Sequence, residues 1–136
     1  MKAWMLKQPK VGTESQARPP TTGQLFEDRA LAFLQSRGLE LVERNFSCRL
    51  GEIDLVMLDK NTLVFVEVKY RRKSRHGHAA EQVTASKRKK LVNSALVFLS
   101  CRDKYASLAC RFDVVGISPG TDKANINWIT NAIDTT

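Results

Sequence analysis

The segment GEIDLVMLDKNTLVFVEVKY, residues 51–70, contains two apolar and β-rich runs, 52–58 and 63–70, separated by the polar tetrapeptide DKNT. Two such runs around a short polar turn are typical of a β-hairpin. We therefore expect Lys60 and Asn61 to form the tip and the two strands to pair in an antiparallel ladder. This hairpin decides the fold, because its register fixes which side chains share a face of the sheet.

An even-numbered turn at that tip places Asp54 opposite Glu67 and Glu52 opposite Lys69. Side chains alternate between the two faces of a strand, so we expect these four to share one face. The other face should be apolar throughout, as in a central sheet that is covered on both sides. It consists of Ile53, Leu55, Met57, Val64, Val66 and Val68.

The facing carboxylates of Asp54 and Glu67 need a partner. Residues directly opposite in a ladder have Cβ atoms about 4.5–5.5 Å apart, and like charges at that spacing destabilise a sheet. A divalent cation would offset the repulsion, because Mg²⁺ binds hard oxygen ligands, commonly one or two carboxylates with phosphate and water. Lys69 could orient a water beside the metal, which completes the parts needed for phosphodiester hydrolysis. The alternative is a salt-bridged strand end, in which Lys69 neutralises Glu52 and Glu67.

The segments around the hairpin predict an α/β fold. Apolar residues recur at helical spacing from Gly23 to Arg37, and Gly38 is placed to end that helix. A first strand is expected over 39–46, and Thr84 can cap a second helix that runs to about Cys101. Two further strands are expected over 111–118 and 126–129, which gives the order α-β-β-β-α-β-β.

The third strand, the second helix and the fourth strand form a β-α-β unit, so that crossover should be parallel and right-handed. Asp113 alternates with apolar neighbours in the fourth strand. We expect it to be structural, paired with Arg111 or with a nearby backbone donor.

The chain is divided into a flexible arm over residues 1–22, one domain over 23–131 and a short tail over 132–136. The arm is polar and contains three of the four prolines. No apolar run approaches the roughly 20 residues of a membrane span, and the N-terminal residues do not resemble a secretory signal. An odd count of three cysteines without a C-x-x-C pair argues against a disulfide framework or a structural zinc site. We expect a cytoplasmic protein.

Positive charge indicates a polyanionic partner. The chain has 22 Lys and Arg against 14 Asp and Glu, a net charge of +8. Nucleic acid is the first expectation and an anionic membrane surface the second. Nine cations against one acid lie between residues 69 and 90. We expect the following to bind phosphates, the alternative being a patch that serves solubility: Arg71, Arg72, Lys73, Arg75, Lys87, Arg88, Lys89 and Lys90.

GEID at 51–54 followed by FVEVK at 65–69 resembles the PD-(D/E)xK motif of the restriction-endonuclease-like superfamily. Within that superfamily the chain is most similar to the YraN family, which itself resembles archaeal Holliday-junction resolvases. The resemblance runs from about Gly23 to Trp128 and includes RFDVV at 111–115. It implies a restriction-endonuclease-like αβββαβ core with a mixed central sheet flanked by helices.

The resemblance also implies roles in the site. Asp54 and Glu67 would bind Mg²⁺ or Mn²⁺, to which we add the Val68 carbonyl, and Lys69 would be the catalytic lysine. Glu27 would be an additional acidic residue of the site, although it could equally be a solvated helix acid. The proline that usually precedes the motif aspartate is replaced by Ile53.

The sequence therefore predicts a metal-dependent endonuclease-like protein that acts on nucleic acid, with DNA favoured over RNA and branched or structured DNA among the substrates. One alternative is a non-catalytic nucleic-acid-binding domain with a nuclease-like fold. Another is a protein-interaction module whose charge is incidental. The sequence leaves open whether two subunits pair as a homodimer.

Overall fold

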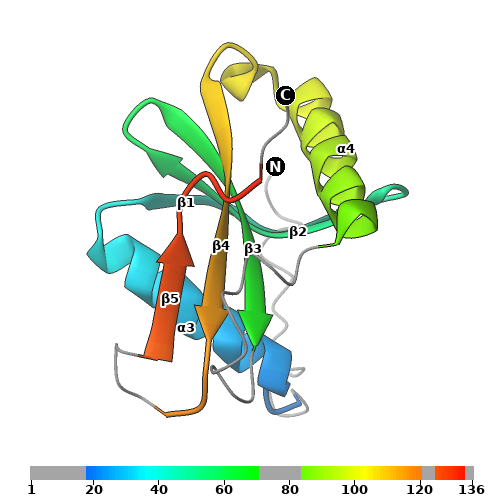
Figure 1. Cartoon of the computed structure of the whole chain (residues 1–136). Coiled ribbons are helices and arrows are strands. Elements are labelled where there is room, and N and C mark those ends of the chain that lie inside the picture. Colours follow the sequence, from blue (N-terminus) through cyan, green and yellow to red (C-terminus); the bar gives the residue numbers. More distant parts are fainter. Residues whose placement is uncertain (1–17, 71–83, 121–124, 134–136) are drawn as a thin grey trace, which may run out of the picture.

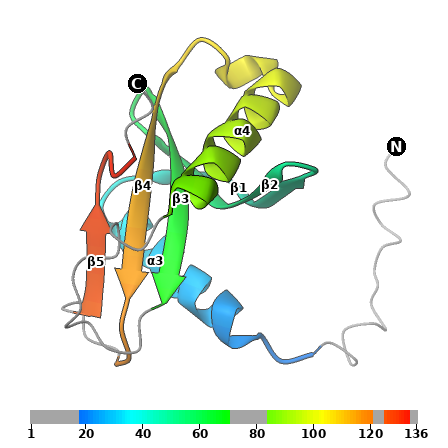
Figure 2. The ribbon, with the colours of Figure 1, turned by 45° about the vertical axis from the view of Figure 1, so that its right-hand side comes forward.

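A mixed five-stranded sheet, in the order β1-β2-β3-β4-β5, is the centre of the computed structural model, which describes residues 18–70, 84–120 and 125–133. Helix α3 packs on one face and helix α4 on the other (Figure 1, Figure 2). The predicted α/β fold and its order of elements are confirmed. Their bounds are α3 Thr22–Ser36, β1 Glu40–Cys48, β2 Gly51–Asp59, β3 Thr62–Tyr70, α4 Ala85–Cys101, the 3₁₀ turn η2 Asp103–Tyr105, β4 Ala109–Ile117 and β5 Ile126–Ile129.

Helix α3 begins one residue earlier than predicted because a capping box fixes its start. The Gln24 amide donates to Thr21 Oγ1 at 3.1 Å, and the Thr21 amide donates to Gln24 Oε1 at 2.8 Å. The folded domain therefore includes Thr21 and Thr22, which were predicted to belong to the arm. The helix ends at Ser36, one residue before the predicted Arg37, and Gly38 follows the C-cap residue Arg37 as predicted, with a φ of 96° that suits a residue without a Cβ.

The hairpin of β2 and β3 has the predicted register, but only as far as the pair Leu55–Val66. Its tip is Lys60-Asn61, with Lys60 at φ 57°. Beyond Leu55, β2 leaves β3, whereas β3 stays paired in parallel with β4 as far as Tyr70. The parallel crossover is thus confirmed. The predicted pairs Asp54–Glu67 and Glu52–Lys69 lie outside the ladder, in a fork between the two strands.

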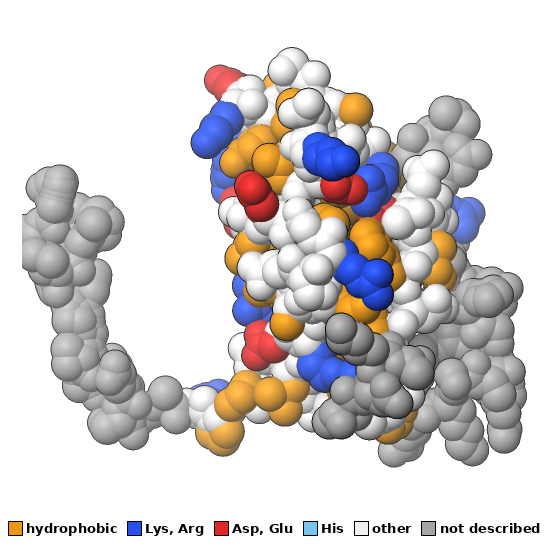
Figure 3. Space-filling model, turned by 90° about the vertical axis from the view of Figure 1, so that its left-hand side faces the viewer, with side chains coloured by type: hydrophobic (Ala, Val, Ile, Leu, Met, Phe, Trp, Pro, Cys, Tyr) orange, Lys and Arg blue, Asp and Glu red, His pale blue; other side chains and the backbone are white. Residues whose placement is uncertain are grey.

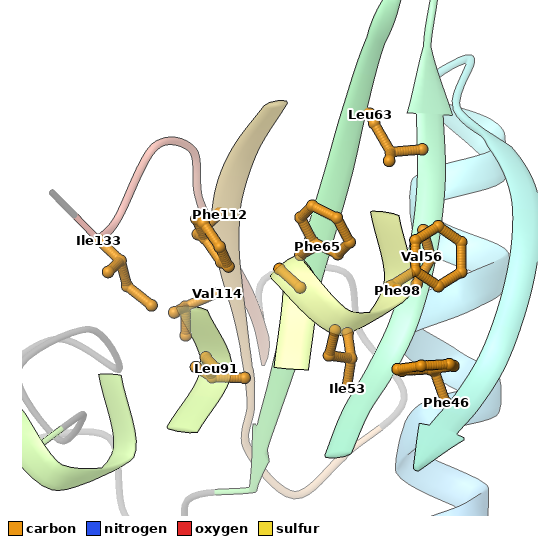
Figure 4. Close-up of a cluster of buried hydrophobic side chains, with 11 residues drawn as sticks. Phe46, Ile53, Val56, Leu63, Phe65, Leu91, Phe98, Phe112, Val114 and Ile133 are labelled. Carbon is orange, nitrogen blue, oxygen red and sulfur yellow. The ribbon is translucent and has the colours of Figure 1, made fainter. Parts of the chain in front are cut away.

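The ribbon of β1 and β2 also changes faces at this fork. Arg44 pairs with Leu55 and reaches the α3 side, whereas Phe46 pairs with Ile53 and packs on the α4 side. In a regular strand, two side chains that are two residues apart, such as those of Arg44 and Phe46, share a face. Asn45 lies between them with φ at 53°, which breaks the alternation. The prediction that Ile53 shares a face with Leu55 was therefore wrong, and Figure 4 shows Ile53 beside Phe46 in the cluster under α4.

Two apolar clusters fill the space between the sheet and its helices. The α4 side contains Phe65, Phe98 and Leu91, among others shown in Figure 4. On the α3 side the residues predicted to be apolar and buried are inaccessible to solvent, apart from half-buried Val68: Leu55, Met57, Val64 and Val66. A sheet covered on both faces is the predicted architecture.

Asp113 has the structural role expected of it. It is fully buried and accepts hydrogen bonds from the Arg111 guanidinium, from Trp128 Nε1 at 3.0 Å and from the Asn131 amide at 2.9 Å. Arg111 also reaches Asp59 at 3.1 Å, at the end of β2 next to the hairpin tip. This network joins β2, β4 and β5 far from the fork.

In the described part of the chain, no helix has both the length and the apolar character of a membrane span.

Candidate active site at the fork of the sheet

A pocket of about 560 Å³ opens where β2 leaves β3. Its size is typical of sites that accept small ligands or parts of larger ones, about 300–1,000 Å³. It is bounded by β2, β3, the turn between β1 and β2, and the first turns of α4. The charged residues that line it are three acids and three cations: Glu52, Asp54, Glu67, Arg49, Lys87 and Lys90.

Asp54 occupies the position where the ladder stops. Its Oδ2 accepts a hydrogen bond at 2.8 Å from the backbone amide of Val68, so the carboxylate spans the gap between the strands. The pKa of Asp54 is raised to about 7, chiefly by burial and next by the nearby charge of Glu67, while the hydrogen bond from the Val68 amide lowers it. The charges of Glu27 and Glu52 also raise this pKa. Asp54 therefore exchanges its proton near neutral pH.

Glu67 of β3 forms an ion pair with Lys87 of α4. Its Oε2 lies 2.8 Å from Lys87 Nζ, and its side chain is only 7% exposed, against 45% for Lys87. Thr84 caps α4 by accepting from the Lys87 amide at 3.1 Å, which places Lys87 in the first turn above the pocket. The hydrogen bond to Glu67 raises the pKa of Lys87, so its ammonium is a permanent cation.

Glu27 of α3 does not line the pocket, but it lies close enough for its charge to raise the pKa of Asp54. Its side chain is 17% exposed, and its Oε1 lies 3.6 Å from the Arg44 guanidinium. That oxygen is buried and has no hydrogen-bond donor among the described residues. Glu27 is thus not a solvated helix acid, and its charge adds to the raised pKa of Asp54.

The turn between β1 and β2 forms the far wall of the pocket and presses against α4. Gly51 has φ at 151°. A Cβ placed on it would lie 2.9 Å from Ser94 Oγ and 3.4 Å from the Lys90 Cβ. A side chain at this position would therefore force either the Ser94 hydroxyl or the turn to shift.

The predicted catalytic lysine, Lys69, and two of the four predicted phosphate-binding cations that the structure describes do not line the pocket. Lys69 is half-buried on β3, beside Gly116 of β4. The ion pair of Lys87 with Glu67 was not predicted, because nothing in the sequence sets the angle at which α4 crosses the sheet. Arg88, Lys89 and Lys90 are exposed on α4. Four predicted phosphate ligands lie outside the described residues: Arg71, Arg72, Lys73 and Arg75.

Charge is mixed on the face that Figure 3 shows, which is at the left in Figure 1. There the described Lys and Arg side chains are interspersed with Asp and Glu, so the described part of this face does not gather positive charge into one patch. The consecutive cations 87–90 lie instead on α4, at the right in Figure 1.

The donor set of the pocket suits a hard divalent cation that is only partly ligated by protein. Among residues 18–70, 84–120 and 125–133, no group of three or more His, Cys, Asp or Glu side chains is placed to hold a metal. Asp54 and Glu67 supply two carboxylates, and Mg²⁺ commonly takes one or two, with water and phosphate completing its shell. The raised pKa of Asp54 reflects a charge that a cation would stabilise.

Comparison with known proteins places these residues within one family. The family described as "Uncharacterised protein family UPF0102" matches residues 26–117, which include the candidate site from Glu27 to Lys90. The UPF0102 protein of Herminiimonas arsenicoxydans is 48% identical over 129 residues, 95% of this chain and 94% of its own length. The one of Stutzerimonas stutzeri (strain A1501) is 47% identical over 114 residues, 84% of this chain and 95% of its own length.

Proposed function

This chain belongs to the uncharacterised protein family UPF0102, and we propose that it is a metal-dependent endonuclease-like protein that hydrolyses phosphodiester bonds in nucleic acid. One observation carries the proposal. The Asp54 carboxyl, with its pKa raised to about 7, shares an open pocket with the nearly buried carboxylate of Glu67 and the ammonium of Lys87. The motif GEID…FVEVK supports a place in the restriction-endonuclease-like superfamily.

Asp54 and Glu67, with the Val68 carbonyl, would hold Mg²⁺ or Mn²⁺. When bound, such an ion activates water and stabilises the charge that develops on the phosphate. The Val68 amide fixes the Asp54 carboxylate at 2.8 Å, so one ligand is held in place by the backbone of the strand that carries the other. Glu27 adds negative charge to the site and favours cation binding.

Two lysines are candidates for the cation that assists the reaction. Lys69 is the lysine of the motif and would orient the attacking water. Lys87 is already bound to Glu67 at 2.8 Å. A phosphate in the pocket would compete with Glu67 for that ammonium and so place it where negative charge develops.

The start of α4 supplies the binding surface. Residues 87–90 are consecutive cations in the first turns of a helix, where they oppose its dipole. A phosphate backbone, with DNA favoured over RNA, would relieve that conflict. The non-catalytic alternative is supported by the small number of metal ligands among the described side chains. Metal-dependent cleavage separates the two.

Calorimetric titration of Mn²⁺ into the wild type and Asp54→Ala tests the site. The wild type should bind Mn²⁺ and Asp54→Ala should not, whereas a control that removes an exposed acid far from the pocket, Asp103→Ala, should bind normally. Cleavage of labelled single-stranded, duplex and branched DNA and of RNA with Mg²⁺ or Mn²⁺ tests the activity. Binding without cleavage of every form would favour the non-catalytic alternative.

A further inference from the structure

Two aromatic rings are stacked at the end of β3. The rings of Phe26 and Tyr70 are 15° from parallel, with centroids 4.1 Å apart. Phe26 is half-buried and packs on the apolar cluster under α3, whereas Tyr70 is 44% exposed. The other large hydrophobic residues that are exposed in the described part of the chain are leucines. Tyr70 thus presents an aromatic surface to solvent on a support that is anchored in the core.

The stack lies at the end of the strand that carries Glu67, on the α3 side of the sheet, whereas Glu67 faces Lys87 of α4. Phe26 precedes Glu27 on α3, and Tyr70 directly follows Lys69 as the last residue of β3. At about 3.3 Å per residue, the three steps from Glu67 to Tyr70 span about 10 Å along the strand. The Glu67 and Tyr70 side chains leave opposite faces of β3, so a nucleic-acid strand that reaches both the pocket and the stack has to pass around the end of this strand.

An exposed aromatic face selects nucleobases that are not already covered. Bases stack on aromatic side chains with little sequence preference, because every base has a π-face. In an intact duplex, neighbouring base pairs already cover those faces, and unstacking a base costs a few kcal/mol. A base that is unpaired from the start does not bear that cost.

We propose that Phe26 and Tyr70 form a stacking platform for an unpaired nucleobase, so that the preferred substrate is nucleic acid that contains unpaired bases. This inference rests on the proposed function. The base stacks on the outer face of Tyr70, and Phe26 holds that ring in place from below. Single strands and the unpaired ends of branched molecules are then bound in preference to continuous duplex.

The test measures binding in EDTA, without cleavage. The probes are a short single-stranded oligodeoxynucleotide that contains 2-aminopurine and a blunt duplex of the same sequence. Tyr70→Ala should weaken single-strand binding between about 5-fold and about 100-fold, the range that corresponds to one lost base stack. Duplex affinity and the salt dependence of binding should not change, because no phosphate contact is removed. Tyr70→Trp should restore single-strand binding and quench 2-aminopurine.

Two further variants separate stacking from packing. Tyr70→Leu keeps an apolar cover over Phe26 but removes the aromatic face, so it should fold like the wild type and bind single strands as weakly as Tyr70→Ala. Leu96→Ala, which truncates a leucine that is 60% exposed on α4, should change neither affinity. If Tyr70→Leu binds single strands like the wild type, or if both probes weaken equally, the platform is wrong.

The outcome is distinguishable from failure of the nuclease proposal. Ring-dependent binding of single strands without any metal-dependent cleavage would retain the platform and overturn the activity. Cleavage that does not depend on Tyr70 would retain the activity and overturn the platform. Absence of binding to either probe by the wild type would overturn both.

Discussion

Ionisation of Asp54 destabilises the folded state. Its pKa is about 7 in the folded protein against 3.8 for the ordinary carboxyl, so the folded state binds this proton more tightly than the unfolded state. The stabilisation is fully present below about pH 4 and is lost as the pH rises through about 7. Above that pH, and without metal, the ionised carboxylate destabilises the fold.

Asp54→Asn should therefore stabilise the metal-free protein at pH 8 by up to a few kcal/mol, since each tenfold difference in proton affinity between the folded and unfolded states corresponds to roughly 1.4 kcal/mol. Asparagine resembles the neutral acid and can still accept from the Val68 amide. Thermal unfolding in EDTA should show a higher Tm than the wild type at pH 8 and a similar Tm at pH 4. Asp103→Asn, at an exposed acid of η2, is the control. An equal difference at both pH values would contradict the raised pKa of Asp54.

Lys69→Ala should lower any metal-dependent cleavage by about 10²–10³-fold, the loss typical of one positioned stabiliser. Its effect on nucleic-acid affinity should be small, because Lys69 is one of the nine cations between residues 69 and 90. Single-turnover cleavage and metal-free binding measure the two quantities. Lys87→Ala is the informative comparison. If it alone abolishes cleavage while Lys69→Ala does not, the assisting lysine is the one on α4.

At the scale of the elements, α4 contributes charge through consecutive cations in its first turns. Neutralising Lys87, Arg88, Lys89 and Lys90 to glutamine should weaken binding to duplex DNA. If each contacts a phosphate, the slope of log affinity against log salt should flatten by roughly three to four, about 0.9 per contact. A salt titration of this variant beside Lys69→Ala measures the difference. An unchanged slope would show that this segment does not contact phosphates.

The contact between the β1–β2 turn and α4 is a second property of the elements. Gly51→Ala should destabilise the protein in two ways, through its positive φ, about 1–3 kcal/mol, and by crowding Ser94, about 1–3 kcal/mol. Gly38→Ala is the matched control, because Gly38 also has a positive φ but an added Cβ would meet nothing within 4 Å. Urea unfolding should show a larger loss for Gly51→Ala. Equal losses would mean that the turn gives way without cost.

The sequence was sufficient to predict the helices and strands, but not the fork at which β2 separates from β3. Alternating apolar residues and the polar turn were enough for the hairpin register up to Leu55–Val66. Beside the fork, Asn45 of the neighbouring strand has a φ of 53°, and the side chains on either side of it point to opposite faces. A single-residue change of backbone conformation leaves no periodic signal, so Ile53 was assigned to the wrong side. The partner of Glu67 depends on the packing of α4, which is a tertiary property.

At the scale of the whole molecule, the Asp113 network holds the sheet together far from the site. Asp113→Ala would leave the Arg111 guanidinium with Asp59 alone and would remove the acceptor of Trp128 and Asn131. Breaking a buried pair in this way costs about 3–5 kcal/mol. Urea unfolding should show this loss, whereas Mn²⁺ affinity of the folded variant should match the wild type. A weakened Mn²⁺ affinity would mean that the network and the fork are coupled.

The parallel pairing of β3 with β4 also bears on the order in which the chain folds. Strands β1, β2 and β3 follow one another in sequence, so their contacts are local and form early. β4 can join β3 only after the whole connection through α4 has closed, which costs more chain entropy. We therefore expect the two strands that carry Asp54 and Glu67 to pair before Lys87 arrives. The repulsion between these two acids would then be present before α4 docks, and the docking of α4 would both complete the core and place Lys87 beside Glu67.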